Sequence, residues 1–299
     1  MTEKYFKLRT DLSIDFCGHK LFRIECIKEI VAKEINVGDL GGYVEKEDNL
    51  SGDAWVYGDA KVYGDAWVYG NAWVYGNAEV SGDAKVYGNA EVSGDAKVYG
   101  NAKVSGDAWV YGNAKVYGNA WVSGNAWVYG NAWVYGNAEV SGDAKVYGNA
   151  EVSGDAKVYG NAKVSGDAWV YGNAKVYGNA WVSGNAWVYG NAWVYGNAEV
   201  SGDAKVYGNA EVYGNAWVYG DAKVCGDKIE NRVDCVNITS QCGYNVTITP
   251  RFLKIGCQFH TKIAWWNFSD TEIEKMDGEK ALNWWKKWKP ILKAICKEQ

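Results

Sequence analysis

The central part of the chain alternates apolar and polar positions with a period of six. From residue 52 to residue 225, the unit Gly-(Asp/Asn)-Ala-x-Val-(Tyr/Ser/Cys) occurs 29 times without interruption. Ala and Val lie two positions apart, so in a strand both point to one side, while x and the last residue of the unit point to the other. Gly followed by Asp or Asn is typical of a turn, because both residue types tolerate positive φ. The pattern therefore predicts one short strand and one turn per unit.

One such unit cannot bury its own Val, but stacked coils can, and this is how solenoids form a core. The period of six is similar to that of hexapeptide β-helices, in which three units make one triangular coil. On that geometry the 29 units predict about 9–10 coils, and strands ~4.8 Å apart would give a rod of roughly 45 Å. We expect an all-β solenoid, a three-sided hexapeptide β-helix. The similarity to hexapeptide β-helices implies left-handed winding. A right-handed three-sided solenoid also fits the spacing.

A rod of this kind exposes an open core and unpaired strand edges at both ends unless something covers them. The chain offers a cover at each end. Residues 1–51 are expected to form a β-rich cap with a hairpin of strands 13–16 and 21–27, turning at Gly18 and His19. The expected organisation is therefore an N-terminal β cap (1–51), the solenoid (52–225) and a small C-terminal α+β cap (226–299).

The C-terminal segment predicts strands at 236–240, 245–249 and 252–255, followed by a helix. Ser269 and Glu272 have the spacing of a capping box at a helix start. Apolar residues rich in Trp follow at helical spacing between 281 and 295, which indicates core packing rather than a cofactor site. Pro290 is expected to kink or interrupt this helix.

The rod contains an internal duplication. Residues 66–152 recur unchanged as residues 126–212, an offset of ten units. Because ten is not a multiple of three, the copy is rotated by one face of the triangle. Rows of side chains on one face of the first copy therefore move to another face in the second, which favours a rod whose length matters more than any single face.

The outward x positions hold 12 Trp, 11 Lys and 6 Glu. Lys85 and Lys103 are one coil apart and would lie side by side as like charges, an unfavourable pairing. Three pairs of Trp residues are also one coil apart. We predict that these six residues bind a partner, because large exposed apolar surface on a protein marks interaction sites. They are Trp55, Trp73, Trp109, Trp127, Trp169 and Trp187.

Catalytic chemistry has little support in the sequence. Hexapeptide acyltransferases use a His as general base, but residues 52–225 contain none, and the two His residues, His19 and His260, fall in the caps. His260 lies three residues from Cys257, which is the one conceivable nucleophile pair. The seven Cys residues include no C-x-x-C pair, and no glycine-rich phosphate loop is present. We expect no catalytic residue, cofactor or metal, and reduced structural thiols, with a metal or redox role as the alternative.

A resemblance to a known family rests on the start of the repeats. Residues 38–45 read GDLGGYVE, residues 49–51 read NLS and lead into the first hexapeptide, and residues 21–24 read LFRI upstream. This arrangement resembles the YdcK-like β-solenoid family over roughly residues 5–225. The resemblance implies a single-chain β-helix of the left-handed class and relatives in bacteria, phages and prophages. It brings no secure activity, although such proteins are labelled acyltransferases or polymer-forming proteins.

Three functions remain open. The first is a non-enzymatic structural or scaffold rod, encoded by a bacterium or its phage. The second is a module whose aromatic surface binds a glycan or a protein partner, and the third is acyl transfer. The net charge of −5 gives no case for nucleic acid, and no stretch is apolar enough to span a membrane. We expect a monomer or weak oligomer in the cytoplasm of a bacterial host, with a virion as the alternative location.

Overall fold

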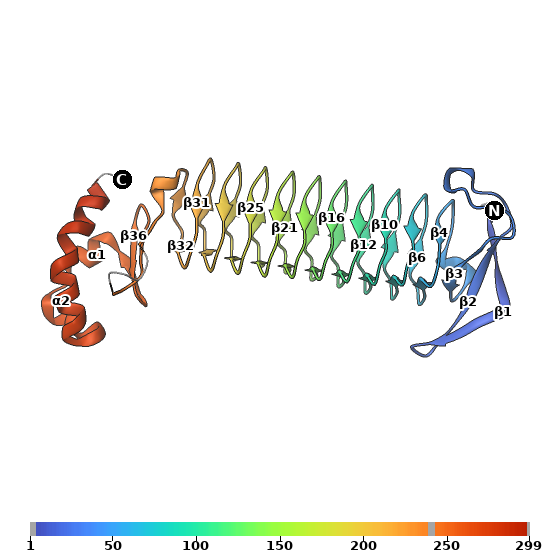
Figure 1. Cartoon of the computed structure of the whole chain (residues 1–299), viewed down its shortest axis with the longest axis horizontal. Coiled ribbons are helices and arrows are strands. Elements are labelled where there is room, and N and C mark those ends of the chain that lie inside the picture. The colour runs from blue at the N-terminus through green and yellow to red at the C-terminus, as the bar shows by residue number, and fades with distance from the viewer. Residues whose placement is uncertain (1–3, 239–242, 298–299) are drawn as a thin grey trace.

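The computed structural model describes residues 4–238 and 243–297 and forms a long rod with a cap at each end (Figure 1). The rod begins with strand β4 (Trp55–Val56), adds one strand every six residues up to β32 (Lys223–Cys225), and ends with β33 (Lys228–Ile229). Every strand from β4 to β32 starts at an x position and contains the following Val. The hexapeptide pattern therefore sets the position of each strand.

Three parallel sheets form the sides of the rod. Each strand pairs in register with the strand one coil later, so that Val56 lies opposite Val74 and Val110 opposite Val128. Two sheets have ten strands, and the third has 13 because it includes strands of the N-terminal cap. The three-sided solenoid of about ten coils is thereby confirmed, while its left-handed winding stays a prediction.

The core of the rod contains the Ala and Val of every unit, each at most 2% exposed. Burying one Val contributes about 1.5 kcal/mol. The glycines form the turns and also fix the distance between coils. At Gly136, φ is +71°, and a Cβ atom would lie 2.9 Å from the backbone nitrogen of Gly154 in the next coil. Only glycine fits such a position, because both the conformation and the space exclude a side chain.

The N-terminal cap is a β hairpin joined to the first coil. Strand β1 (Phe6–Phe16) pairs with β2 (His19–Cys26), and the turn lies at Cys17 and Gly18, one residue earlier than predicted. Strand β3 (Leu40–Val44) is antiparallel to β2 and parallel to β5 (Lys61–Val62), and so joins the cap to a sheet of the rod. Two 3-10 helices, η1 (Val31–Lys33) and η2 (Glu47–Asn49), complete this cap.

The glycines of the GDLGGYVE motif lie where the hairpin crosses the first coil. A Cβ atom on Gly41 would lie 2.5 Å from both the Ile24 side chain and the Val56 carbonyl oxygen, and one on Gly42 would lie 2.7 Å from the Ala60 carbonyl oxygen. Gly41 and Gly42 are therefore glycines because the backbone of β3 lies in direct contact with its neighbours, which leaves no room for a side chain.

The C-terminal cap has a four-stranded antiparallel sheet and two helices. Its strands are β34 (Val236–Ile238), β35 (Val246–Ile248), β36 (Phe252–Ile255) and β37 (Gln258–Thr261), and its helices are α1 (Lys262–Asn267) and α2 (Asp270–Lys297). The first three strands match the predicted ones, except that residues 239 and 240 lie outside the described part of the chain. Strand β37 and helix α1 were not predicted.

Helix α2 begins as predicted, but its break lies elsewhere. The Ser269 N–H donates to Glu272 and the Glu272 N–H donates to the Ser269 hydroxyl, as in a capping box. The expected kink at Pro290 is wrong, because the non-helical residues are Asp277 and Gly278. Pro290 and Lys286, whose carbonyl group loses its partner, are both exposed, so water can satisfy that carbonyl.

Candidate binding surfaces

The six candidate Trp residues differ in their surroundings. All three pairs lie on neighbouring strands as expected. The rings of Trp109 and Trp127 stack with centroids 5.5 Å apart, and those of Trp169 and Trp187 do the same. Trp109 and Trp169 are among the exposed large side chains of the rod. These two pairs therefore form small aromatic platforms on different faces.

The expectation that Trp55 faces solvent is wrong. Trp55 is only 1% exposed, although it has the same sequence context as the exposed Trp109. Lys33 and Leu40 of the N-terminal cap line one pocket together with Trp55 and Trp73. Lys33 Nζ donates to the carbonyl oxygens of Asn71 and Ala72 at 2.7 and 3.1 Å and lies 4.7 Å above the Trp73 ring. The first Trp pair thus belongs to the contact between cap and rod.

Lysines on neighbouring strands avoid each other by leaning in opposite directions. Lys97 lies beside Lys115 in the sheet, but its Nζ bonds Glu79 at 2.9 Å on the coil before. Lys115 instead lies 4.5 Å above the Trp133 ring on the coil after. Lys85 is beside Lys103 as predicted, and its Nζ lies 5.9 Å from the centre of the Trp67 ring. Cation–π contacts and ion pairs along the rod therefore relieve the like-charge pairing.

The turn residues form hydrogen-bonded ladders along the corners of the rod. In one of them, Asn101 donates to Asn119, Asn119 to Asn137, and Asn137 to Asp155, at 3.1, 3.0 and 2.9 Å. This run ends at Asp155 because an ionised carboxylate accepts but cannot donate, whereas the run that begins at Asn161 ends at Asn215 in the last coil. This explains why the repeat allows both Asn and Asp at this position.

The last position of each unit also pairs with the next coil. Tyr159, Tyr177, Tyr195 and Tyr213 stack in a row with neighbouring centroids 4.9–5.2 Å apart. At some positions in these rows a smaller Ser replaces Tyr. The indole N–H of a Trp in the next coil then donates to the Ser hydroxyl. Examples are Trp121 to Ser105 and Trp181 to Ser165, both at 3.0 Å.

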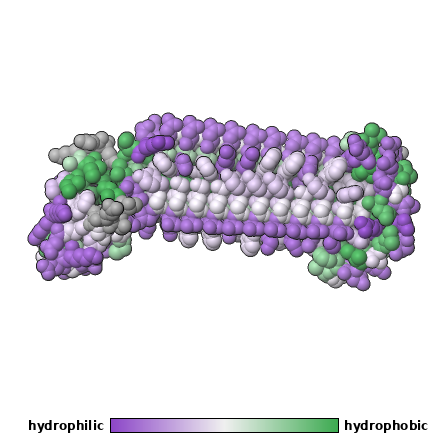
Figure 2. All heavy atoms as spheres, in the orientation of Figure 1, coloured by the Kyte–Doolittle hydropathy of each residue, from purple (hydrophilic) through white to green (hydrophobic). Residues whose placement is uncertain are grey.

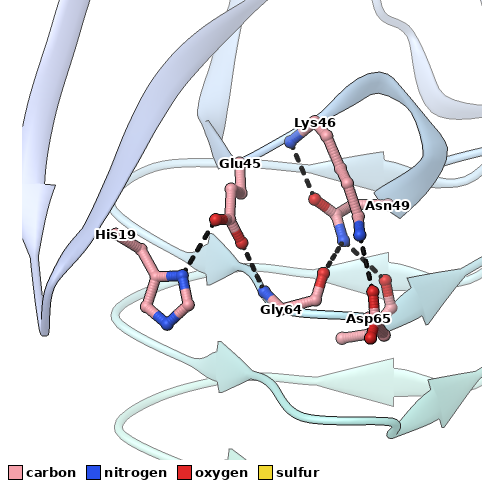
Figure 3. A network of polar contacts seen from close by, with 7 residues as sticks. His19, Glu45, Lys46, Asn49, Gly64 and Asp65 are labelled. Carbon is pink, nitrogen blue, oxygen red and sulfur yellow. Dashed lines mark hydrogen bonds and ion pairs between the residues drawn. The ribbon is translucent and has the colours of Figure 1, made fainter.

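A polar network joins the N-terminal cap to the first corner (Figure 3). Glu45 lies 2.9 Å from His19 Nδ1 and accepts from the Gly64 N–H at 2.6 Å. Burial tends to raise the pKa of Glu45, but the bonds from His19 and Gly64 outweigh it and hold that pKa below the ordinary value. Asn49, which is fully buried, donates to the carbonyl oxygens of Gly64 and Ala66 at 3.1 and 2.7 Å. The NLS motif therefore contains the residue that fastens this junction.

The C-terminal cap meets the rod through two aspartates of the last turns. Asp221 accepts from Asn245 at 2.8 Å and from Asn237 at 3.3 Å, and Lys254 Nζ lies 3.5 Å away. Burial raises the pKa of Asp221, but these partners together lower it below the ordinary value. Asp227 is 1% exposed and is bonded by Arg251 and Thr249.

The C-terminal cap contains a cavity of about 220 Å³ between the sheet and the helices. Its lining includes the aromatic side chains of Tyr244, Trp265, Trp284 and Trp285, together with Asp277. The Tyr244 hydroxyl donates to Asp277 at 2.6 Å. Burial, followed by that bond, raises the pKa of Tyr244 to about 12, so the hydroxyl stays protonated at neutral pH. The cavity was missed in the sequence, where the Trp residues indicated packing alone.

The Cys257 and His260 side chains have different neighbours. Cys257 lines the cavity, whereas His260 does not. His260 Nε2 lies 3.2 Å from Gln258 Oε1, and its ring packs edge-on against Trp265 and Phe268. Within residues 4–238 and 243–297, no group of three His, Cys, Asp or Glu side chains could hold a metal ion, and no helix is long and apolar enough to cross a membrane.

These features define a class of protein: a three-sided parallel β-solenoid with a distinct cap at each end. The model of the YdcK β-solenoid repeat matches eight stretches of the rod, namely residues 60–76, 96–112, 108–124, 114–130, 156–172, 168–184, 174–190 and 204–220. The chain belongs to this family of β-solenoid repeat proteins. No curated protein matches the chain.

Proposed function

We propose that the protein is a non-enzymatic scaffold rod that holds its two end caps at a fixed separation. The pairing of outward side chains along the rod carries this proposal. Asn101 bonds the next coil, Tyr159 stacks on the next Tyr, and Lys115 lies on the next Trp. Side chains engaged in this way stabilise and stiffen the rod and offer few unsatisfied groups to a ligand. Ten strands at a spacing of ~4.8 Å span about 43 Å.

The distribution of surface hydropathy supports the same proposal. Figure 2 shows hydrophilic and pale rows running along the rod, whereas the hydrophobic residues on this face gather at the two ends. Hydrophobic surface marks interaction sites, so the ends are the parts that meet partners. The partners we propose are proteins of a bacterial host or of its phage, met in the cytoplasm or on a virion.

A change of rod length tests the proposal. Deleting residues 130–183 removes three whole coils and keeps the three faces in register. We expect this variant to fold with both caps intact and to be shorter by about 14 Å in small-angle X-ray scattering. The proposal would be overturned in favour of an enzyme if the protein transferred acetyl groups from acetyl-CoA and the substitution His260→Asn abolished this activity.

A binding module for a glycan or protein is the second candidate, and the exposed Trp side chains favour it. Seven of them are 37–43% exposed on the rod. Lys occupies the same position in 11 of the units, so Trp109→Lys and Trp169→Lys should leave the fold intact. Glycan-array or pull-down binding that both substitutions abolish would favour this function over the scaffold.

A further inference from the structure

The cavity in the C-terminal cap has walls made of aromatic rings that face in different directions. Tyr244 and Trp284 are perpendicular, at 86°, with ring centroids 5.2 Å apart. Trp265 and Trp285 lie at 40° to each other, also 5.2 Å apart. In the perpendicular pair the edge of one ring meets the face of the other, and all four rings line the same small volume at different angles. Aromatic cages that hold the methylated ammonium groups of ligands are likewise lined by several rings.

One carboxylate adds a negative charge to this lining. Among the described residues that line the cavity, Asp277 is the only charged one. It lies at the break in α2, where Gly278 has a φ of +68° and the chain leaves the helical conformation. The break brings Asp277 to the Tyr244 hydroxyl, 2.6 Å away. A carboxylate beside aromatic walls favours a cationic ligand over a neutral one.

Lysines of the same cap already use these rings as cation acceptors. Lys280 Nζ lies 5.3 Å from the centre of the Tyr244 ring, and Lys289 Nζ lies 5.2 Å from that of Trp285. Neither lysine belongs to the cavity lining. Two of the rings that line the cavity are therefore already in contact with ammonium groups of the cap itself.

We propose that this cavity binds a small quaternary ammonium compound of the choline type. The trimethylammonium group would contact Trp284, Trp285 and Tyr244, and Asp277 would supply the opposite charge. The volume of about 220 Å³ lies below the ~300–1,000 Å³ of pockets for drug-sized ligands. The cavity therefore suits a compact head group. The site adds a small ligand to a cap that, in the proposed scaffold function, meets a protein partner.

Isothermal titration calorimetry of the full chain with choline tests this inference. The comparison ligand is 3,3-dimethylbutan-1-ol, which has the same shape without the charge. We expect choline to bind about tenfold more tightly, a difference of about 1.4 kcal/mol, because only the charged ligand gains from cation–π contacts. Equal affinities, or binding of the alcohol alone, would overturn the proposal and identify a merely apolar cavity.

Matched variants locate the site. Asp277→Asn keeps a hydrogen-bond acceptor for Tyr244 and removes the charge, so choline affinity should fall about fivefold. Glu274→Gln removes an exposed charge of the same helix outside the lining and should leave the affinity unchanged, and circular dichroism checks that both variants fold. Unchanged affinity in Asp277→Asn would contradict the assignment. A further arm uses phosphatidylcholine vesicles, and binding to vesicles without binding to choline would replace the small ligand by a membrane.

Discussion

The two ends of the rod are closed in different ways. Apolar residues of the N-terminal cap, among them Phe6, Ile24 and Leu50, belong to one continuous core that runs through all coils to Ile229 and Cys235. The C-terminal cap has a core of its own, in which Leu253 and Ile255 pack against Trp265 and Trp285. The first cap is thus the beginning of the solenoid, whereas the second is a separate module attached to its end.

The strand pairing explains this difference. Val44 of β3 lies opposite Val62 of β5, so the cap contributes a strand to a rod sheet. At the other end, β34 pairs with β35 in a new antiparallel sheet. The links back to the rod include the polar contacts of Asp221 and Asp227. A cap joined through a shared core should melt with the rod, and one joined through polar contacts can separate from it.

Truncation should give the largest effect. A chain of residues 52–299 lacks the cover over Trp55 and Val56, which are at most 1% exposed in the whole protein. We expect it to aggregate, because an open core and unpaired strand edges are exposed. A chain of residues 1–238 keeps Cys235 over the last coil and should remain a folded rod. Size-exclusion chromatography and circular dichroism measure both, and equal behaviour of the two truncations would contradict the comparison.

Matched substitutions in the two cores should give the next largest effect. Ile24 and Leu253 are both fully buried, and replacing either by Ala should cost about 2–5 kcal/mol. Ile24→Ala should raise hydrogen exchange in the cap and the first coils together. Leu253→Ala should raise it in residues 243–297 while the rod stays protected. Exchange measured by mass spectrometry separates these outcomes, and a rod loosened by Leu253→Ala would show that the cores are coupled.

The features that repeat along the chain could be predicted from the sequence, whereas the features that depend on single tertiary contacts could not. Each hexapeptide contains its own strand, turn and core residues, so the three-sided rod could be inferred from local pattern alone. Trp55 has the same hexapeptide context as Trp109, but it is buried where Lys33 and Leu40 of the cap lie around it. No periodic signal contains that information.

The candidate cavity could not be predicted from the sequence for the same reason. Its walls come from Tyr244, before β35, and from Trp284, far along α2, and tertiary packing brings them together. The break at Asp277 and Gly278 could have been suspected from the glycine, since Gly in a helix interior is unfavourable. Pro290 gave the stronger signal but lies on an exposed side of the helix, where water can satisfy the freed Lys286 carbonyl oxygen.

Acid should loosen the C-terminal cap before the N-terminal one. The pKa values of Asp221 and Glu45 are both below the ordinary values in the folded protein. Their stabilising contribution is therefore full above the unfolded pKa and is lost as the pH falls through the folded pKa. The N-terminal cap keeps its shared apolar core in acid, whereas the other cap loses part of its attachment.

Hydrogen exchange between pH 5 and pH 2.5, corrected for the intrinsic rate, measures this order of release. The control is Asp221→Asn, because Asn is common at the same turn position elsewhere in the rod. In this variant the C-terminal cap should be looser at pH 5 and should change less as the pH falls. Release of the N-terminal cap first would show that Glu45 and its partners contribute more than the shared core.

The smallest effect should come from the two lysines that meet the ends of the turn ladders. Asp follows Asp one coil later only at 65 and 83 and at 203 and 221, and a cap lysine meets each pair. Lys46 Nζ lies 2.6 Å from Asp65 with 46% of its side chain exposed, and Lys254 Nζ lies 3.5 Å from Asp221 with 7% exposed.

Lys46→Met should cost a few tenths of a kcal/mol, since exposed ion pairs contribute ~0.2–1 kcal/mol. Lys254→Met should cost about 1 kcal/mol or more, because it also removes a bond to the Asp221 carbonyl oxygen. Denaturant titrations at low and high salt measure both losses. A larger loss of stability in Lys46→Met than in Lys254→Met would contradict this order. It would show that the charge of Lys46 on the ladder contributes to the stability of the N-terminal end alongside the shared core.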